Sequence, residues 1–308
     1  MTTSSPFGAA FDQAAVAPEL RAFNEHSARL MAGKPGIWDI GAAAIRDAGL
    51  MPRLPPSPRA IDRSIDGVPV HIVPVNSPRG VYLHIHGGAL VMGSAAGQDP
   101  MLERIADQVG VTCVSIDYRL APEHPYPAAW DDCEKVGLWL ARHAKTEFGA
   151  EALLIGGESI GATLAVPTLI RLRDRHAFAG FRGANLSFGT YDAGMTPSQR
   201  NARQGVVRMQ DIARNLAAYC PDSRQLGNPD ISSLYADLRQ LPSALFTVGT
   251  LDAFLDDSMF MYCRWLSAGN RAEIAVWPGA DHAFTDMPHP SAGPANARID
   301  RVLAACLE

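Results

Sequence analysis

A serine stands between two glycines near the middle of the chain, where a hydrophobic run meets a helical one. Residues 157–161 read Gly-Glu-Ser-Ile-Gly, directly after Leu-Leu-Ile-Gly at 153–156. Where a strand turns sharply into a helix, the hydroxyl of such a serine is exposed, and the helix N-terminus favours developing negative charge. The pattern also fits a serine that only caps a helix. The preceding strand and the helical run at 162–175 favour Ser159 as a nucleophile for acyl transfer.

Two later hydrophobic runs end in residue types that activate a serine. Residues 244–248 lead to Asp252, and residues 273–277 lead to His282. A histidine can take the hydroxyl proton as general base, while a carboxylate at its other ring nitrogen stabilises the imidazolium. The order serine, aspartate, histidine is one in which such triads occur. Ser159, Asp252 and His282 are therefore the predicted catalytic triad, and a plain surface histidine is the alternative for His282.

Three other carboxylates stand close enough in sequence to compete with Asp252. Asp256 and Asp257 lie one helical turn later, where charged residues often begin a solvated helix. Asp281 directly precedes His282, and we expect its side chain to point elsewhere because adjacent side chains diverge along the backbone. Asp252 is therefore the expected partner of the histidine.

A loop upstream of the serine could supply the donors that acyl transfer needs. Residues 81–89 read as a strand that ends in His-Gly-Gly-Ala. A tetrahedral intermediate carries an oxyanion, which preset N–H groups stabilise, and glycines let the main chain approach it. We expect donors from Gly88 and Ala89, with Gly87 as a further candidate, and one from Ile160 after the serine. A simple glycine turn is the alternative, and the loop histidine is expected to brace the loop.

The elements that must position these residues alternate between strand and helix. Helical stretches such as 126–148 separate short β-rich runs, which predicts a mostly parallel sheet covered on both faces. Asp66-Gly67 between the first two runs predicts an antiparallel hairpin. The runs lie at 60–65, 68–75, 81–86, 111–117, 153–157, 184–188, 244–248 and 273–277.

Two segments fall outside this alternation. The first 50 residues read as helical and amphipathic, and a proline-rich stretch follows at 51–58. Residues 191–236 interrupt the second half of the chain. We expect a helical arm over residues 1–55 and a catalytic domain over residues 56–308, with the arm and the 191–236 insertion forming a lid.

Composition excludes several classes of protein. The 308 residues are 47% hydrophobic with a formal net charge of −5, which suits one large core and provides no basic field for nucleic acid or anionic lipid. The five cysteines are odd in number and contain no Cys-x-x-Cys pair, so neither a zinc site nor a redox motif is expected. We recognise no secretory signal and no membrane-spanning run, so a cytoplasmic location is expected.

With these pieces in place, the sequence resembles the hormone-sensitive-lipase-like esterases of bacteria, the family IV carboxylesterases. The resemblance covers most of residues 60–306. Its most specific part, residues 117–129, reads Asp-Tyr-Arg-Leu-Ala-Pro-Glu-His-Pro-Tyr-Pro-Ala-Ala and looks like that family's segment between a strand and a helix. The His-Gly-Gly run, the serine turn and Asp-His-Ala-Phe at 281–284 add to it.

The resemblance implies an α/β-hydrolase fold, in which a mostly parallel eight-stranded sheet carries helices on both faces and a helical lid. It implies a serine carboxylesterase that hydrolyses short acyl esters without metal or organic cofactor. We expect acyl chains of about two to six carbons, because the lid looks compact and such pockets are small. Arg119 and Glu123 are expected to be buried in ion pairs, and a homodimer is kept open because family members often pair through a sheet edge.

Three features near the site depart from the family's usual pattern. Ala89 and Leu90 stand where a third glycine and an aromatic residue are usual, Ile160 replaces a small residue, and Ala283 replaces a glycine. None of these changes removes a required group, since Ala89 and Ile160 keep their N–H donors. We therefore expect altered substrate preference, with Leu90 and Glu158 in contact with the substrate.

Other activities could use the same framework. An amidase or formamidase, or an acyltransferase with another acceptor alcohol, needs the same groups as an esterase. Non-catalytic receptors on this scaffold resemble esterases but lose the histidine, whereas this sequence retains His282. A carboxylesterase is the leading interpretation.

Overall fold

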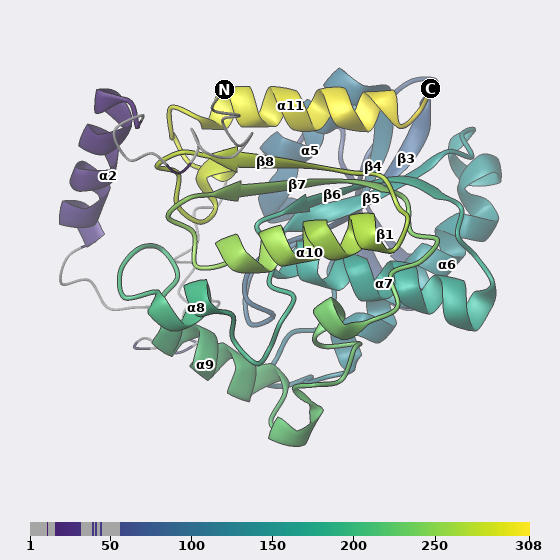
Figure 1. Ribbon diagram of the computed structural model, residues 1–308. Helices are drawn as coiled ribbons and strands as arrows, with labels where there is room; N and C mark the ends of the chain where they lie inside the picture. Colours follow the sequence, from purple (N-terminus) through teal and green to yellow (C-terminus); the bar gives the residue numbers. More distant parts are fainter. Residues whose placement is uncertain (1–10, 12–15, 32–38, 40, 42–43, 45–55) are drawn as a thin grey trace.

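An eight-stranded sheet runs through the centre of the protein in this computed structural model (Figure 1). The structure describes residues 11, 16–31, 39, 41, 44 and 56–308. Across the sheet the order is β1-β2-β4-β3-β5-β6-β7-β8. The strands are β1 (Ile61–Ile65), β2 (Val68–Val73), β3 (Gly80–Ile85), β4 (Val111–Ile116), β5 (Leu153–Glu158), β6 (Phe181–Ser187), β7 (Ser243–Gly249) and β8 (Ala272–Trp277).

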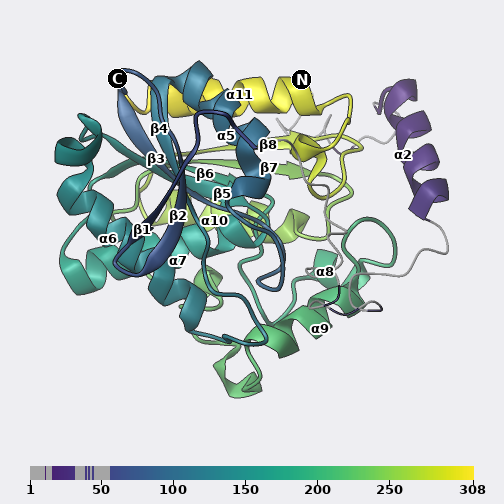
Figure 2. The ribbon, with the colours of Figure 1, turned by 180° about the vertical axis from the view of Figure 1, so that it is seen from behind.

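The first two strands form the antiparallel hairpin that Asp66 and Gly67 predict. The φ angles of these residues are 48° and 82°, as a type I′ turn requires. β2 is also antiparallel to β4, whereas β3 to β8 all pair in parallel. Figure 2 shows the hairpin at one edge of the sheet, beside α6 (Ala128–Phe148).

The three central strands are buried along their whole length. Every residue of β3, β4 and β5 is buried. Because successive side chains of a strand face opposite sides, Leu83 packs into one core layer and Tyr82 into the other. Burial on both faces explains the continuous apolar runs, which are typical of parallel sheets.

Helices cover both faces of this sheet. In Figure 1, α5 and α11 lie on one side and α6, α7 and α10 on the other. Val136 and Leu172 from α6 and α7 complete one core layer, and Leu102 and Ile299 from α5 and α11 complete the second. This architecture confirms the predicted fold class. The helices are α5 (Asp99–Ile105), α7 (Ile160–His176), α10 (Leu255–Ser267) and α11 (Ala292–Ala305).

The remaining elements include those that cover one end of the sheet, on the left and below in Figure 1. Residues 191–236, which we call the lid segment, contain α8, α9, η4 and η5. The predicted arm over residues 1–55 includes α2, and most of the rest of it lies outside the described residues. These elements are α2 (Pro18–Met31), α8 (Pro197–Asn201), α9 (Met209–Tyr219), η4 (Ser223–Gln225) and η5 (Ser233–Tyr235), with η2 (Ala96–Gln98), η3 (Ala106–Gly110) and η6 (Phe284–Asp286) elsewhere.

All five cysteines are free thiols. Cys113, Cys133 and Cys220 are buried, Cys263 is exposed and Cys306 is half-buried. Among the helices that the structure describes, none combines the length and the apolar character needed to cross a bilayer.

Candidate active site

Ser159 lies at the turn between β5 and α7. Its backbone adopts a strained conformation, with φ 55° and ψ −124°, which persists only where the surroundings enforce it. A Cβ at Gly161 would lie 1.8 Å from the carbonyl oxygen of Ile85, and one at Gly157 would lie 2.1 Å from the same atom. The two glycines therefore let the turn press against the end of β3, which no other residue type would allow.

The structure brings His282 and Asp252 to this serine. Asp252 follows β7 and His282 follows β8, so both stand at the edge where the parallel strands end. The Nε2 atom of His282 lies 2.9 Å from Ser159 Oγ, and its Nδ1 lies 3.0 Å from Asp252 Oδ2. A carboxylate can only accept, so Nδ1 carries the proton and Nε2 remains free to accept the serine proton.

The surroundings of His282 tune its basicity. Burial by itself lowers the pKa of this imidazole, but the charge of Asp252 and its hydrogen bond outweigh burial and raise the pKa above the ordinary value. The rings of Phe188 and Phe254 pack edge-on against the imidazole, with centroids 5.0 Å and 5.2 Å away. His282 is therefore a somewhat stronger base than a free histidine, held in one orientation.

The competing carboxylates have other partners. Asp281 accepts the N–H groups of His282 and Val206, at 2.7 Å and 3.1 Å. Asp256 accepts the N–H of Ser198 at 2.8 Å. Asp281 therefore ties the lid segment to the loop after β8, and Asp256 ties it to the first turn of α10.

The expectation of a solvated helix start is wrong for Asp257. This side chain is 0% exposed and accepts hydrogen bonds from the N–H of Tyr191 at 2.7 Å, from Thr196 Oγ1 at 2.7 Å and from Gln199 Nε2 at 2.7 Å. Burial raises the pKa of Asp257 to about 6, although these hydrogen bonds oppose the shift. It holds the start of the lid segment against α10.

The loop after β3, residues 86–92, contains three successive residues with positive φ; we call it the glycine loop. The φ angles of Gly88, Ala89 and Leu90 are 118°, 57° and 63°, and a Cβ on Gly88 would lie 2.1 Å from the carbonyl oxygen of Met92. Within the described part of the chain, the N–H groups of Gly88 and Ala89 meet no acceptor. The N–H of Ile160, in the first turn of α7, has no partner within its helix. These donors are available to a ligand.

Gly87 requires a correction, because its N–H is already used. It donates to Glu158 Oε1 at 2.7 Å, which removes Gly87 from the expected set of oxyanion donors. His86 behaves as expected for a brace. Its Nδ1 donates to the Gly87 carbonyl oxygen at 2.6 Å, and its ring stacks on Tyr118 at 4.2 Å.

Leu90 and Glu158 also differ from expectation, since neither side chain is presented to a substrate. Leu90 is 1% exposed and belongs to the main core cluster. Glu158 is 5% exposed, and its two carboxylate oxygens face Gly87 and the Nε2 atom of His84. Sequence reasoning missed His84, whose partners come from strands distant in the chain.

A small apolar cluster of the lid segment lies beside the imidazole. Phe254, which contacts His282, shares this cluster with Ile212 of α9. Partly buried side chains from the lid segment pack against it. These are Met195, Ala202 and Val207. Through Phe254, the lid segment therefore contributes apolar side chains to a cluster that reaches the imidazole of His282.

The arm reaches the same region from the other side. Asn24 of α2 donates from Nδ2 to the carbonyl oxygen of Gly279 at 2.7 Å, and Phe23 packs edge-on against His289 at 5.0 Å. Both contacts fall on the segment around His282. The arm therefore contacts the loop that carries the histidine.

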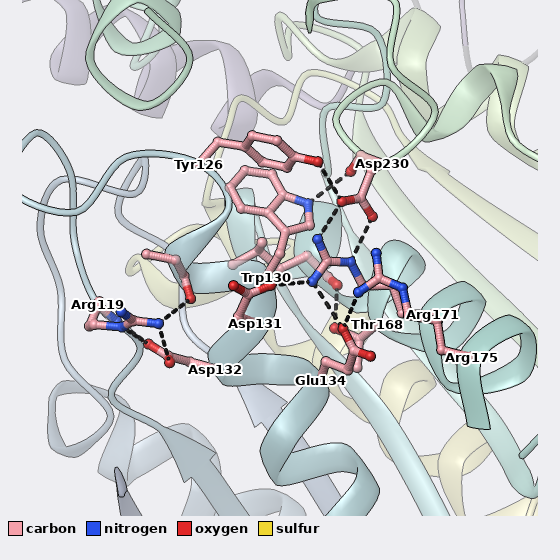
Figure 3. Close-up of polar contacts among 12 residues, drawn as sticks. Arg119, Tyr126, Trp130, Asp131, Asp132, Glu134, Thr168, Arg171, Arg175 and Asp230 are labelled. Atoms are coloured by element: carbon pink, nitrogen blue, oxygen red, sulfur yellow. Dashed lines mark hydrogen bonds and ion pairs between the residues drawn. The ribbon is translucent and has the colours of Figure 1, made fainter.

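The far end of the lid segment is anchored by charge (Figure 3). Arg171 of α7 is 4% exposed, and it donates to Asp230 at 2.9 Å, to Asp131 at 2.8 Å and to Glu134 at 3.1 Å. Tyr126 donates its hydroxyl to Asp230 as well, at 2.9 Å. This cluster joins the lid segment to α6 and α7.

The segment 117–129 holds fewer buried charges than expected. Arg119 pairs with Asp132 at 2.8 Å, yet its side chain is 45% exposed (Figure 3). Glu123 is exposed. The expectation that Arg119 and Glu123 are buried is therefore wrong, because both side chains lie on the exposed side of this segment, whereas Asp132, the partner of Arg119, is buried. Within the described residues, no cluster of three or more His, Cys, Asp or Glu side chains could hold a metal ion.

Comparisons with known proteins agree with this architecture. A model of the alpha/beta hydrolase fold family matches residues 82–286, which is more than half of the chain. The chain therefore belongs to this family, the hormone-sensitive-lipase-like branch that the sequence resembles.

Several relatives carry names of one kind. The chain is 31% identical to an esterase of Acinetobacter venetianus over 196 residues, 63% of this chain and 62% of that protein. It is 27% identical to an acetyl esterase of Salmonella schwarzengrund over 217 residues, 68% of this chain and 67% of that protein. The chain thus spans somewhat under two thirds of the first of these relatives. Its fold is similar to that of an esterase from Pyrobaculum calidifontis, with a TM-score of 0.82, 24% identity and coverage of 94% and 98% of the two chains.

Proposed function

We propose that this protein is a serine carboxylesterase that hydrolyses small acyl esters with Ser159, His282 and Asp252 as its triad. The observation that carries the proposal is the continuous line of hydrogen bonds from Asp252 through His282 to Ser159 Oγ. Beside it lie N–H groups of the glycine loop that meet no acceptor among the residues the structure describes. The names of the curated relatives support esters as the substrate class.

The reaction proceeds in two acyl-transfer steps. Ser159 Oγ attacks the ester carbonyl carbon while its proton passes to Nε2 of His282. The resulting oxyanion accepts hydrogen bonds from the N–H groups of Gly88, Ala89 and Ile160. His282 then returns the proton to the departing alcohol, which leaves an acyl-serine.

Water completes the cycle. His282 takes a proton from a water molecule, and the hydroxide attacks the acyl-serine carbonyl. The second intermediate collapses when the Ser159 oxygen leaves and regains its proton from His282. The free acid departs, and every group returns to its starting state.

Short acyl chains, of about two to six carbons, are the proposed substrates. The apolar cluster around Ile212 and Phe254 lies directly beside His282, which limits the length of chain that fits between the nucleophile and the lid segment. The name of the acetyl esterase relative is consistent with this preference.

A panel of nitrophenyl esters from acetate to dodecanoate tests the proposal, with the nitroanilide of the best acyl group alongside. We expect the highest kcat/KM among the short esters, a much slower amide reaction, and no turnover by Ser159→Ala with an unchanged melting temperature. Full activity of Ser159→Ala would refute the triad. A faster anilide would favour an amidase, and a maximum at dodecanoate would refute the short-chain preference.

A further inference from the structure

A row of buried polar groups lies beneath the glycine loop. Glu158 Oε1 accepts the N–H of Gly87 at 2.7 Å, and Oε2 lies 2.9 Å from His84 Nε2. On the other side of the imidazole, Nδ1 lies 2.8 Å from Ser115 Oγ. Since the carboxylate of Glu158 can only accept, His84 donates a hydrogen bond to it from Nε2 and accepts one at Nδ1 from the hydroxyl of Ser115.

This row is shielded from water, and each polar side-chain atom of Glu158, His84 and Ser115 has a hydrogen-bond partner. His84 and Ser115 are fully buried, as is nearly all of Glu158. A satisfied network of this kind in a low-dielectric interior is rigid, because each broken bond would leave an uncompensated polar group. The network joins three neighbouring strands, β4, β3 and β5, at the end where the reacting groups stand.

The position of Glu158 links the two halves of the site. It directly precedes Ser159, so its backbone moves with the nucleophile turn, while its carboxylate holds the residue just before Gly88 and Ala89. Of these two, Ala89 carries a Cβ and still adopts a positive φ angle of 57°, a conformation that persists only where the surroundings enforce it. A single side chain therefore links the nucleophile turn to the loop that carries the N–H donors.

We propose that Glu158 is a positioning residue of this site, which holds the glycine loop in the geometry that receives the oxyanion, and that His84 fixes the carboxylate of Glu158. This inference rests on the proposed esterase function. The carboxylate acts through the backbone of Gly87 and does not touch the substrate. Its effect falls on transition-state stabilisation, since the donors meet full negative charge only there.

Three substitutions separate positioning from simple stability. Glu158→Ala removes both acceptors, and we expect kcat to fall by about ten- to a hundredfold with KM changed less than about threefold, somewhat below the loss of a whole oxyanion donor. Glu158→Gln keeps an oxygen for the Gly87 N–H and offers N–H to a retautomerised His84, so it should recover most of the lost kcat. Glu158→Asp is too short to reach both partners and should resemble the alanine variant, which keeps the comparison available if the alanine variant does not fold.

Asp99 offers a matched control elsewhere in the molecule. It is 1% exposed, and it likewise accepts a backbone N–H, that of Ser57 at 2.6 Å, and faces a histidine Nε2, that of His71 at 2.7 Å. Asp99→Ala therefore breaks the same kinds of contact beside β2, where, among the described residues, no hydrogen bond of Asp99 or His71 reaches Ser115, His84 or Glu158. We expect a lower melting temperature with kcat close to that of the parent.

A double-mutant cycle tests the role of His84. If His84 acts only through Glu158, then His84→Ala combined with Glu158→Ala should cost no more kcat than Glu158→Ala alone. Fully additive losses would overturn that part of the inference. Rates of Ser159 phosphonylation by a small fluorophosphonate should fall in the same order as kcat, because the phosphonyl oxygen uses the same donors.

The outcomes distinguish this inference from the proposed function. Parent-like kcat in Glu158→Ala, together with an inactive Ser159→Ala, would overturn the inference and leave the esterase mechanism standing. An equal loss of kcat in Asp99→Ala, or no recovery in a folded Glu158→Gln, would also overturn it. An active Ser159→Ala would overturn both.

Discussion

Asp252 holds the ring nitrogen of His282 that faces away from Ser159, with Oδ2 3.0 Å from Nδ1. Burial lowers the pKa of this histidine, and the charge of Asp252 and its hydrogen bond raise it to a level above the ordinary 6.5. Only the neutral imidazole can accept the serine proton, so activity is lost as the pH falls through this pKa.

This relationship predicts the acid limb of the pH profile. As the pH is lowered, we expect kcat/KM of the parent to fall with a midpoint above pH 6.5. In Asp252→Asn this midpoint should lie at a lower pH, because the carboxylate no longer raises the pKa of His282. The asparagine also favours the wrong tautomer, so kcat should fall by roughly 10⁴-fold. Steady-state profiles from pH 4 to about 9 would measure both effects; coincident limbs would contradict the assignment of Asp252.

The turn at Ser159 depends on the absence of a side chain at Gly161. A Cβ there would lie 1.8 Å from the Ile85 carbonyl oxygen, so Gly161→Ala must displace β3 or the turn itself. We expect it to abolish activity and to lower the free energy of unfolding by about 3 kcal/mol or more. Gly293 in α11 has open space around its Cβ position, so Gly293→Ala should stabilise the helix by about 0.5 kcal/mol. Urea denaturation of both variants provides the comparison.

The buried carboxyl of Asp257 makes stability depend on pH. Burial raises its pKa in the folded chain from 3.8 to about 6, so the folded state binds this proton more tightly than the unfolded state. The stabilisation of the folded state that this tighter proton binding provides is therefore fully present below pH 3.8. It is lost as the pH rises through about 6, which changes the free energy of unfolding by about 3 kcal/mol.

Asp257→Asn removes this titration and leaves the other groups in place. The difference in unfolding free energy between the parent and Asp257→Asn should therefore become less favourable to the parent from pH 4 to pH 7, by about 2.4 kcal/mol. Urea denaturation at several pH values measures it. A difference that stays constant across this range would show that the carboxyl titrates normally.

The charge cluster in Figure 3 should contribute measurably to stability. Asp230→Ala removes two hydrogen bonds of the buried Arg171 guanidinium but leaves Asp131 and Glu134 in place. We expect a loss of about 2 kcal/mol, less than for a buried charge left without any partner. Glu273→Ala breaks an exposed pair with Arg298 and should change stability by less than about 0.5 kcal/mol. A loss in Asp230→Ala as small as the 0.5 kcal/mol or so expected for Glu273→Ala in denaturation experiments would mean that the cluster is energetically neutral.

Two successive turns of α9 should affect substrate preference differently. Ile212 belongs to the apolar cluster beside His282, whereas Leu216 packs against the main core. Ile212→Ala should move the best acyl chain in the nitrophenyl panel to a longer ester because it removes part of the wall. Leu216→Ala should leave the chain-length profile unchanged and lower only the melting temperature. The reverse pattern would place the acyl chain elsewhere.

The sequence pointed to the proposed reacting groups because each carries a local signature. Ser159 lies between glycines that a sharp strand-to-helix turn requires, and Asp252 and His282 each follow an apolar run that forms a buried strand. Parallel strands end at a common edge of the sheet, so residues far apart in the chain could be expected to meet. The hairpin at Asp66-Gly67 was predictable for the same reason, since its backbone conformation is a property of two adjacent residues.

Only the tertiary structure decided which polar groups remain free to act. Gly87 and Glu158 are separated by 71 positions, and the sequence around either residue does not reveal that the N–H of Gly87 donates to the Glu158 carboxylate. The sequence around Asp257 predicts a solvated helix start, whereas in the folded protein the chain after β6 covers its carboxylate. A hydrogen bond between distant segments depends on how the layers pack, and packing is a property of the whole chain. Residue types therefore indicated the chemistry, and the three-dimensional contacts assigned each group to reaction or to support.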